Sequence, residues 1–282
     1  ALLINASYFP EKQQGLSLGI SITITGIAQA LGPTLGGVIL HFLNWHYLFL
    51  LNVPLGVLSF VGTLVFCKND VPMHKQTALF DFSIFKLPKY NLILVIRTLY
   101  MMVWMCVLFT LPIYLQYGLG LKPLHAGFMM LAATGLFGVV SPMAGKLLDQ
   151  FGSRLPLRVA LVFAMTSFSV LIISIMTSSM LGFISSLVLF GISAGMFIPS
   201  SVFAASEALP NQAKGSGMGV FFSLTFVGSF VGVSLSTFIM SLLQNYAHAM
   251  VVIYIVNLSV VVALMILSAY MVSGNRSALK SS

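Results

Sequence analysis

The sequence predicts an all-α integral membrane protein with about eight transmembrane helices. Of its 282 residues, 59% are hydrophobic and 6% are charged, and the mean hydropathy is +1.04. Soluble domains carry about 25% charged residues, so this composition is not suited to a surface that faces water. A bilayer core takes roughly 20 apolar residues per helix, which leaves room for about eight spans and for no separate soluble domain.

The predicted helices correspond to eight apolar runs, each long enough to cross a bilayer. A polar stretch over 68–89, which contains Pro72 and Pro88, is the best boundary between two groups of helices. The runs are 14–42, 45–67, 90–116, 124–147, 156–179, 181–205, 215–243 and 247–272.

The basic residues predict how these helices are oriented. With the N-terminus in the cytoplasm, all but two of the 13 Lys and Arg residues fall on the cytoplasmic side, while Lys122 falls outside and Arg97 lies within a helix. Positive charge gathers in cytoplasmic loops, so both ends of the chain are predicted to be cytoplasmic. The net charge of +8 then reflects this asymmetry and not a nucleic-acid partner.

The first run contains a series of small residues that gives a helix one flat face. Gly19, Gly32, Gly36 and Gly37 allow another backbone to approach closely, and Pro33 removes a backbone donor and bends the helix. Two interpretations stay open from the spacing: plain helix packing, or a flexing seam between two halves that rock against each other.

Four segments together resemble the drug:proton antiporter group of the major facilitator superfamily, which is related to the fourteen-helix multidrug exporters. The glycine series resembles the group's antiporter motif in the fifth helix, with Ala28 where Gly is usual, and His46 stands where Arg or Lys is usual. The other three segments are Trp45-His46-Tyr47-Leu48-Phe49 with Asn52-Val53-Pro54-Leu55-Gly56, Leu111-Pro112-Ile113-Tyr114-Leu115-Gln116, and Gly145-Lys146-Leu147-Leu148-Asp149-Gln150-Phe151-Gly152-Ser153-Arg154.

This resemblance covers nearly the whole chain and implies its organisation. Residues 1–67 would hold the last two helices of an N-terminal bundle, and 68–89 a cytoplasmic loop between bundles. Residues 90–272 would form a six-helix C-terminal bundle, followed by a cytoplasmic tail over 273–282. The match begins at the end of the family's fourth helix, so the chain is expected to lack the first four helices.

The last of these segments carries a cluster of charges between two predicted helices. Asp149 can pair with Arg154 or Arg158, and Gly145 and Gly152 allow a tight turn. A latch that closes the cytoplasmic side and an ordinary positively charged loop both remain open as interpretations.

Ionisable groups are scarce inside the spans. None of the five acids lies deep in a span, so the sequence offers no obvious proton-coupling residue. Arg97 lies six residues beyond Asn91, or roughly 9 Å into its helix, where it could snorkel, bind a structural partner or line the translocation path. Asn52, Trp104 and Gln116 are the other candidates for a cavity lining, although each could simply pack.

The resemblance implies a secondary active transporter that exports small lipophilic or cationic compounds by proton antiport with alternating access. The alternative is a truncated, non-transporting remnant or a membrane partner subunit. The sequence has no nucleotide-binding loop, no His and Cys at metal-ligand spacing and no catalytic constellation, so we expect no cofactor, no metal and no enzyme activity. The expected partners are the lipid bilayer, the substrate and protons, with no nucleic acid, and the expected location is the bacterial inner membrane.

Overall fold

The structure is a computed structural model that describes residues 24, 28, 31–32, 35–40, 42–66, 82–210, 213–243 and 245–276. Within these residues the regular elements are all helical, and seven helices are long and apolar enough to cross a membrane. The predicted all-α membrane fold is therefore confirmed. The first of the eight predicted runs, 14–42, falls largely outside the described residues.

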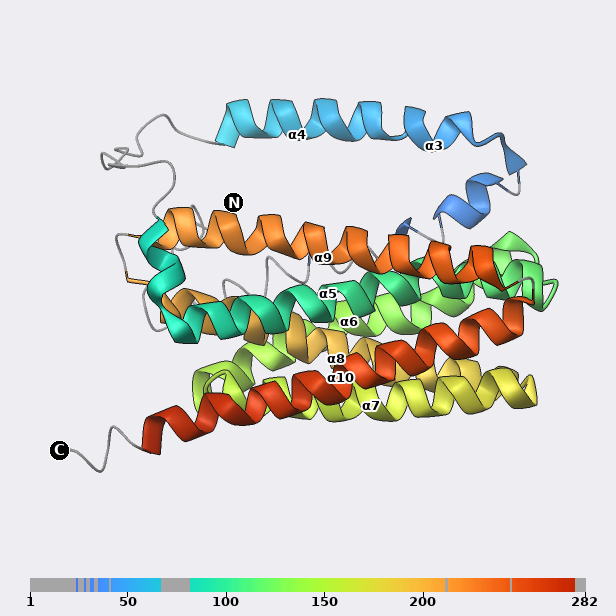
Figure 1. The fold of residues 1–282 in the computed structure, drawn as a ribbon. Coiled ribbons are helices and arrows are strands. Elements are labelled where there is room, and N and C mark those ends of the chain that lie inside the picture. The colour runs from blue at the N-terminus through green and yellow to red at the C-terminus, as the bar shows by residue number, and fades with distance from the viewer. Residues whose placement is uncertain are drawn as a thin grey trace.

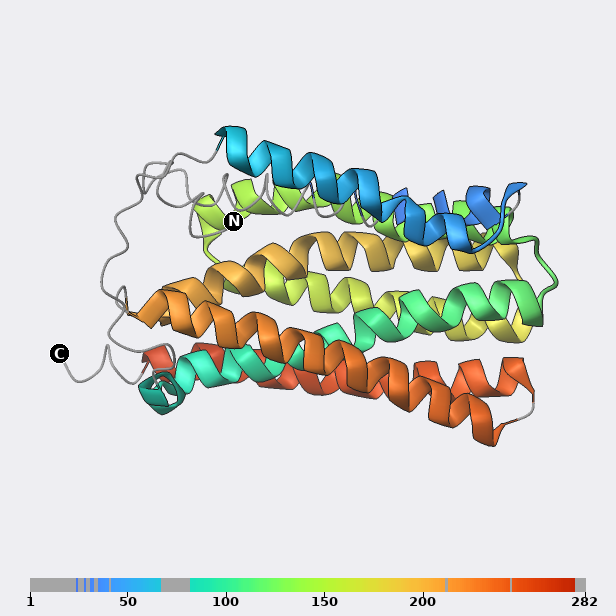
Figure 2. The same ribbon diagram turned by 90° about the horizontal axis from the view of Figure 1, so that it is seen from above.

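Six long helices lie side by side and form one bundle (Figure 1). Each is joined to the next by a short connection, so consecutive helices run in opposite directions and their ends alternate between the two ends of the bundle (Figure 2). They are α5 (Pro88–Ile113), α6 (Pro123–Phe151), α7 (Arg154–Thr177), α8 (Met180–Ala208), α9 (Lys214–Leu242) and α10 (Tyr246–Arg276).

Local sequence explains where several of these helices begin and end. Pro88 and Pro123 stand in the first turns of α5 and α6, where the missing N–H of proline costs no helical hydrogen bond. Ser179 caps α8 by accepting a hydrogen bond from the backbone N–H of Gly182 at 3.3 Å. Gly152 ends α6 with a φ of 69°, a left-handed value that glycine adopts without strain.

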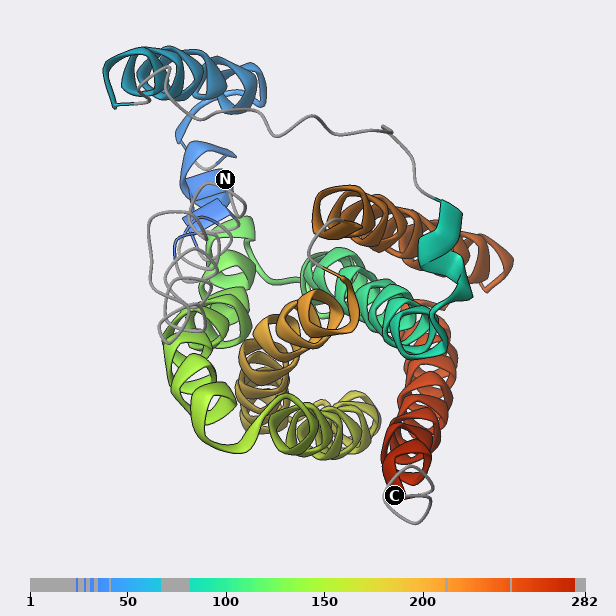
Figure 3. The same cartoon turned by 90° about the vertical axis from the view of Figure 1, so that its left-hand side faces the viewer.

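Helix α8 lies at the centre of the bundle, where it packs against α6 and α7 and also touches α5 and α9 (Figure 3). Two glycines one turn apart permit the contact with α6. A Cβ on Gly191 would overlap the Ala133 carbonyl oxygen, and one on Gly195 would lie 2.7 Å from the Cβ of Val140. The absence of side chains at these two positions lets the helices approach closely.

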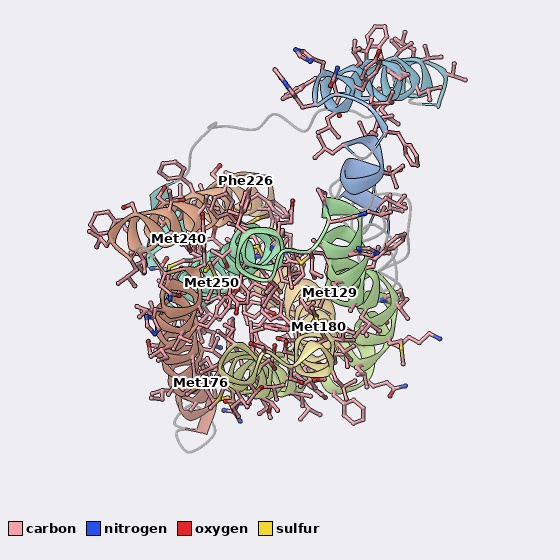
Figure 4. All side chains as sticks on the ribbon, turned by 90° about the vertical axis from the view of Figure 1, so that its right-hand side faces the viewer. Met129, Met176, Met180, Phe226, Met240 and Met250 are labelled. Atoms are coloured by element: carbon pink, nitrogen blue, oxygen red, sulfur yellow. The ribbon has the colours of Figure 1, made fainter. Side chains whose placement is uncertain are left out.

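Helix α9 packs on α5 by the same device. A Cβ on Gly228 would overlap the carbonyl oxygen of Thr98, and one on Gly232 would overlap that of Met102. The opposite side of α9 is apolar and exposed: Phe226 is 72% exposed and lies on the outer side of the helix (Figure 4). The glycine face of α9 therefore allows close contact with the backbone of α5, and the opposite, apolar face suits contact with lipid or another helix.

A second, smaller part of the described chain stands away from the bundle. Helices α3 (His46–Leu50) and α4 (Asn52–Phe66) form a continuous apolar span that Figures 1 and 3 both show apart from α5–α10. No residue of α4 whose exposure is described is buried. The predicted loop between the two parts, 68–89, is described from residue 82, where a short 3₁₀-helix, η2 (Phe82–Lys86), precedes α5.

Candidate functional site

The candidate site is a row of buried side chains between α5 and α8. Arg97, Tyr100 and Trp104 recur at three- and four-residue spacing, which places them on one face of α5. Their side chains are 4%, 0% and 1% exposed. We call these three, together with their partners on α8, the α5–α8 stripe; the partners are Phe190, Ser193, Phe197 and Ser201.

Arg97 bonds to α8 and not to the membrane surface. Its Nη1 donates to Ser201 Oγ at 3.0 Å and to the Ile198 carbonyl oxygen at 3.4 Å, and its Cζ lies 5.6 Å from the centre of the Phe221 ring. The snorkelling interpretation is therefore wrong for this structure. The physical reason is that α8 offers acceptors near the guanidinium, so the side chain need not extend toward the headgroups.

The middle of the stripe combines a hydrogen bond with an aromatic stack. The hydroxyls of Tyr100 and Ser193 are 2.8 Å apart, and the Tyr100 ring stacks on Phe197 with centroids 3.6 Å apart and an interplanar angle of 11°. Aromatic pairs in this geometry add specific stabilisation beyond burial. This contact therefore fixes the rotation of α5 against α8.

Trp104 lies between aromatic rings from two helices. Its ring is 5.1 Å from that of Phe190 on α8 and 5.7 Å from that of Phe137 on α6. Trp104 Nε1 and Arg97 Nε are both buried, and neither has a hydrogen-bond partner among the described residues. Buried polar groups are normally paired, so these two unpaired donors on one helix face are the candidate polar contacts for a ligand.

The other two residues predicted to line a cavity lie elsewhere. Asn52 is an exposed residue of α4, and its Nδ2 donates to the Leu48 carbonyl oxygen at 3.4 Å. Gln116 lies in a π-helical turn, η3 (Tyr114–Gly118), where its Nε2 donates to the carbonyl oxygen of Pro112 at 3.1 Å. The structure thus brings Arg97 and Trp104 together on one face and places neither Asn52 nor Gln116 in the stripe.

The glycine series of the first run is described in part. A Cβ on Gly37 would lie 3.1 Å from the carbonyl oxygen of Pro123, so this glycine packs against the start of α6. Gly32 and Gly36 have no atom within 4 Å of such a Cβ, and Gly19 and Pro33 lie outside the described residues. The predicted close approach is thus present at one position of the series.

The predicted charge cluster does not form an ion pair in the described part of the chain. Asp149 is exposed near the end of α6, and no contact of 4.0 Å or less joins it to Arg154 or Arg158. Arg158 instead donates from Nη2 to the carbonyl oxygen of Ser268 on α10 at 3.3 Å. In this conformation Arg158, four residues into α7, is thus directed to a neighbouring helix, and the pairing with Asp149 stays a prediction.

The glycines of the same loop segment have different surroundings. Gly145 is buried within α6, one turn before Asp149, whereas Gly152 forms the turn between α6 and α7. Only Gly152 therefore serves the tight turn that the sequence predicted for both.

Sequence reasoning missed a polar junction of three helices. Cys106 Sγ on α5 accepts hydrogen bonds from Ser236 on α9 and from Asn257 Nδ2 on α10, each at 2.9 Å. It also missed the glycine pairs of α8 and α9. The Gly-x-x-x-Gly spacing was the signal that could have found those pairs, whereas no local pattern joins Cys106 to two distant helices.

The described residues place no group of three or more His, Cys, Asp or Glu side chains where they could hold a metal ion. Of the five acids, the structure describes Asp149 and Glu207, which lie near the ends of α6 and α8. The arrangement can therefore hold a ligand by stacking and hydrogen bonding, and offers no carboxylate within the stripe.

Comparison with known proteins agrees with this architecture. The family model of the Major Facilitator Superfamily matches residues 1–233. The riboflavin transporter RibZ of Clostridioides difficile is 24% identical over 265 residues, which cover 76% of this chain and 58% of that protein. The lincomycin resistance protein LmrB of Listeria monocytogenes is 23% identical, with 83% of this chain and 61% of LmrB covered.

A third relative is the multidrug resistance protein Stp of Mycobacterium tuberculosis, which is 25% identical over 287 residues. These residues cover 82% of this chain and 53% of Stp. The chain thus spans little more than half the length of the curated relatives it matches.

Proposed function

Because the chain belongs to the Major Facilitator Superfamily, we propose that it is a secondary active transporter that exports small lipophilic or cationic compounds by proton antiport. The observation that carries the proposal is the α5–α8 stripe, an aromatic and hydrogen-bonding surface inside a membrane bundle. Such a surface suits lipophilic ligands with a few polar groups. Relatives named for lincomycin and multidrug resistance support export, while the riboflavin transporter shows that the relatives differ in substrate.

Alternating access would move the helices of the stripe relative to a second bundle. Gly19, Gly32, Pro33, Gly36 and Gly37 would form the seam for this motion, and the contact of Gly37 with the start of α6 supports a close approach there. In this proposal residues 1–67 belong to the N-terminal bundle and 90–272 to the C-terminal bundle.

The loop segment with Gly145, Asp149, Gly152, Arg154 and Arg158 would control the inner side of the bundle. In the described conformation the bond from Arg158 to the Ser268 carbonyl ties α7 to α10. Asp149 would then pair with an arginine in another state of the cycle, when that bond is broken.

The chain would cross the bacterial inner membrane several times with both of its ends in the cytoplasm. The asymmetric distribution of its basic residues supports this orientation. Its multi-pass character follows from the seven apolar helices among the described residues.

Reconstituted vesicles test the proposal. The intact protein is placed in liposomes with an inside-acidic proton gradient, and uptake of one neutral and one cationic lipophilic fluorophore is followed. Antiport predicts uptake that stops when an ionophore removes the gradient. Uptake that is the same with and without the proton gradient excludes antiport. The absence of uptake of either compound supports the alternative of a non-transporting remnant or partner subunit.

A variant pair links transport to the stripe. Trp104→Ala removes the ring of the stripe that stacks on Phe190 and is expected to abolish gradient-driven uptake. Trp45→Ala removes a ring that is 56% exposed and lies outside the bundle, and is expected to retain uptake. Equal transport by the two variants would contradict the assignment of the stripe as the binding surface.

A further inference from the structure

Arg97 is a buried cation whose charge has no anionic partner among the described residues. Its contacts are a hydroxyl, a carbonyl oxygen and an aromatic ring, supplied by Ser201, Ile198 and Phe221. Neither Asp149 nor Glu207 forms an ion pair with it. A guanidinium inside a membrane bundle is costly unless an anion compensates it, and dipoles and a ring compensate it only in part.

The guanidinium also keeps hydrogen-bonding capacity. Arginine has five N–H donors in a planar fork, and the described contacts of Arg97 use Nη1 while its Nε remains without a partner. A carboxylate binds such a fork through two parallel hydrogen bonds. The remaining donors of the Arg97 guanidinium therefore suit a carboxylate or a similar anionic group.

The surroundings of Arg97 indicate what the rest of the ligand would be. Trp104 lies two turns further along the same face of α5, roughly 10 Å away along the helix axis. Its ring contacts the Phe190 and Phe137 rings, and its Nε1 is buried without a partner among the described residues. Tyr100 and Phe197 stack between these two positions. An anion-binding site at Arg97 thus adjoins an aromatic surface that offers one more hydrogen-bond donor, Trp104 Nε1.

The geometry points to a ligand that is a lipophilic aromatic compound with a carboxylate or similar anionic group bound at Arg97. This inference rests on the proposed function and narrows its substrate class: cations are disfavoured in the stripe, because the like charge of Arg97 repels them where little water screens it. Arg97 is 4% exposed, so the ligand reaches it in another state of the transport cycle, when the stripe has moved relative to the second bundle.

Three probes with one aromatic scaffold test this inference: pyrenebutyrate, its neutral primary amide, and the matching trimethylammonium compound. Binding is measured on the full chain in lipid nanodiscs by energy transfer from tryptophan to pyrene. The chain has two tryptophans, so Trp45→Phe leaves Trp104 as the donor beside the stripe. We expect the carboxylate to bind at least ten-fold more tightly than the amide, and the cation to bind most weakly.

Variants of Arg97 assign the preference to this side chain. Arg97→Gln is expected to bring the carboxylate-to-amide ratio close to one, and Arg97→Lys, which keeps the charge, to retain part of the preference. Lys122→Gln removes an exposed positive charge at the start of α6 and is expected to leave the ratio unchanged. Thermal unfolding of each variant in nanodiscs identifies any that fail to fold, and Arg97→Lys then still tests the role of charge.

The outcomes separate this inference from the proposed function. Equal binding of the three probes, or an undiminished carboxylate preference in Arg97→Gln, overturns the anionic substrate and leaves the stripe as a binding surface. No binding of any probe overturns the proposed site and this inference together.

Discussion

The α3–α4 pair and helix α5 have almost the same hydropathy, 2.1 and 2.2 over their membrane windows, but 0% of the first window and 56% of the second is buried. What differs is the neighbours of each helix and the bonds that join them. Helix α5 presents the Thr98 and Met102 carbonyls to glycines of α9, whereas Gly56 and Gly62 of α4 have no atom within 4 Å of an added Cβ. Apolar composition places a helix in the bilayer, but small residues stabilise packing only where a neighbouring backbone meets them.

The largest expected effect on stability distinguishes the two tryptophans. Trp104→Ala is expected to lower the free energy of unfolding by about 3–5 kcal/mol, because it leaves a cavity among Phe137 and Phe190. Trp45→Ala is expected to change it little, because this ring is 56% exposed. Thermal unfolding in a single detergent measures both, and similar losses for the two variants would break the comparison.

Glycine substitutions are expected to have the next largest effect. Gly228→Ala places a methyl group against the Thr98 carbonyl oxygen and is expected to destabilise the bundle by about 1–3 kcal/mol, as overpacking does. Gly62→Ala adds the same atom to α4, where it meets nothing within 4 Å. Unfolding curves for both proteins sharpen the comparison, and a neutral Gly228→Ala would show that α5 and α9 are less closely packed than described.

The smallest expected effect comes from one interhelical hydrogen bond. The hydroxyls of Tyr254 on α10 and Thr110 on α5 are 3.0 Å apart, both buried. Tyr254→Phe is expected to cost about 0.6 kcal/mol, the average for such bonds in membrane proteins. Tyr47→Phe, at a ring that is 47% exposed, is the matched control. A larger loss in the control than in Tyr254→Phe would contradict the role of polar contacts in the bundle.

Much of the fold could be predicted because hydropathy and the residues that start or end helices act locally. The predicted run 124–147 corresponds to the helix Pro123–Phe151, and the predicted run 181–205 to the helix Met180–Ala208. Both helices are longer than the apolar runs because they extend to the proline, serine and glycine residues at their ends. The division into bundles stays a prediction, since part of the chain lies outside the described residues.

The site could be predicted less well, because its contacts join distant parts of the sequence. Arg97 and Trp104 stood out as polar or amphipathic residues within a span. Their partners could not be predicted, because Ser201 lies 104 residues beyond Arg97, Phe190 lies 86 residues beyond Trp104, and both contacts depend on how α8 packs. The same holds for the cluster around Asp149. The sequence allowed Asp149 to pair with Arg154 or Arg158, and in this conformation Arg158 donates to a carbonyl of α10, which no local pattern indicates.

The central helix α8 is rich in serines that bond to carbonyls of their own helix. Ser186 donates to Phe183, Ser200 to Met196 and Ser201 to Ile198, over 2.6–2.8 Å. A helix that carries its acceptors with it can rotate or shift its register without leaving these hydroxyls unpaired in a medium that has no water to replace the bond. The polar cost of moving α8 is then concentrated in the few bonds that cross to its neighbours, such as those to Arg97 and Tyr100.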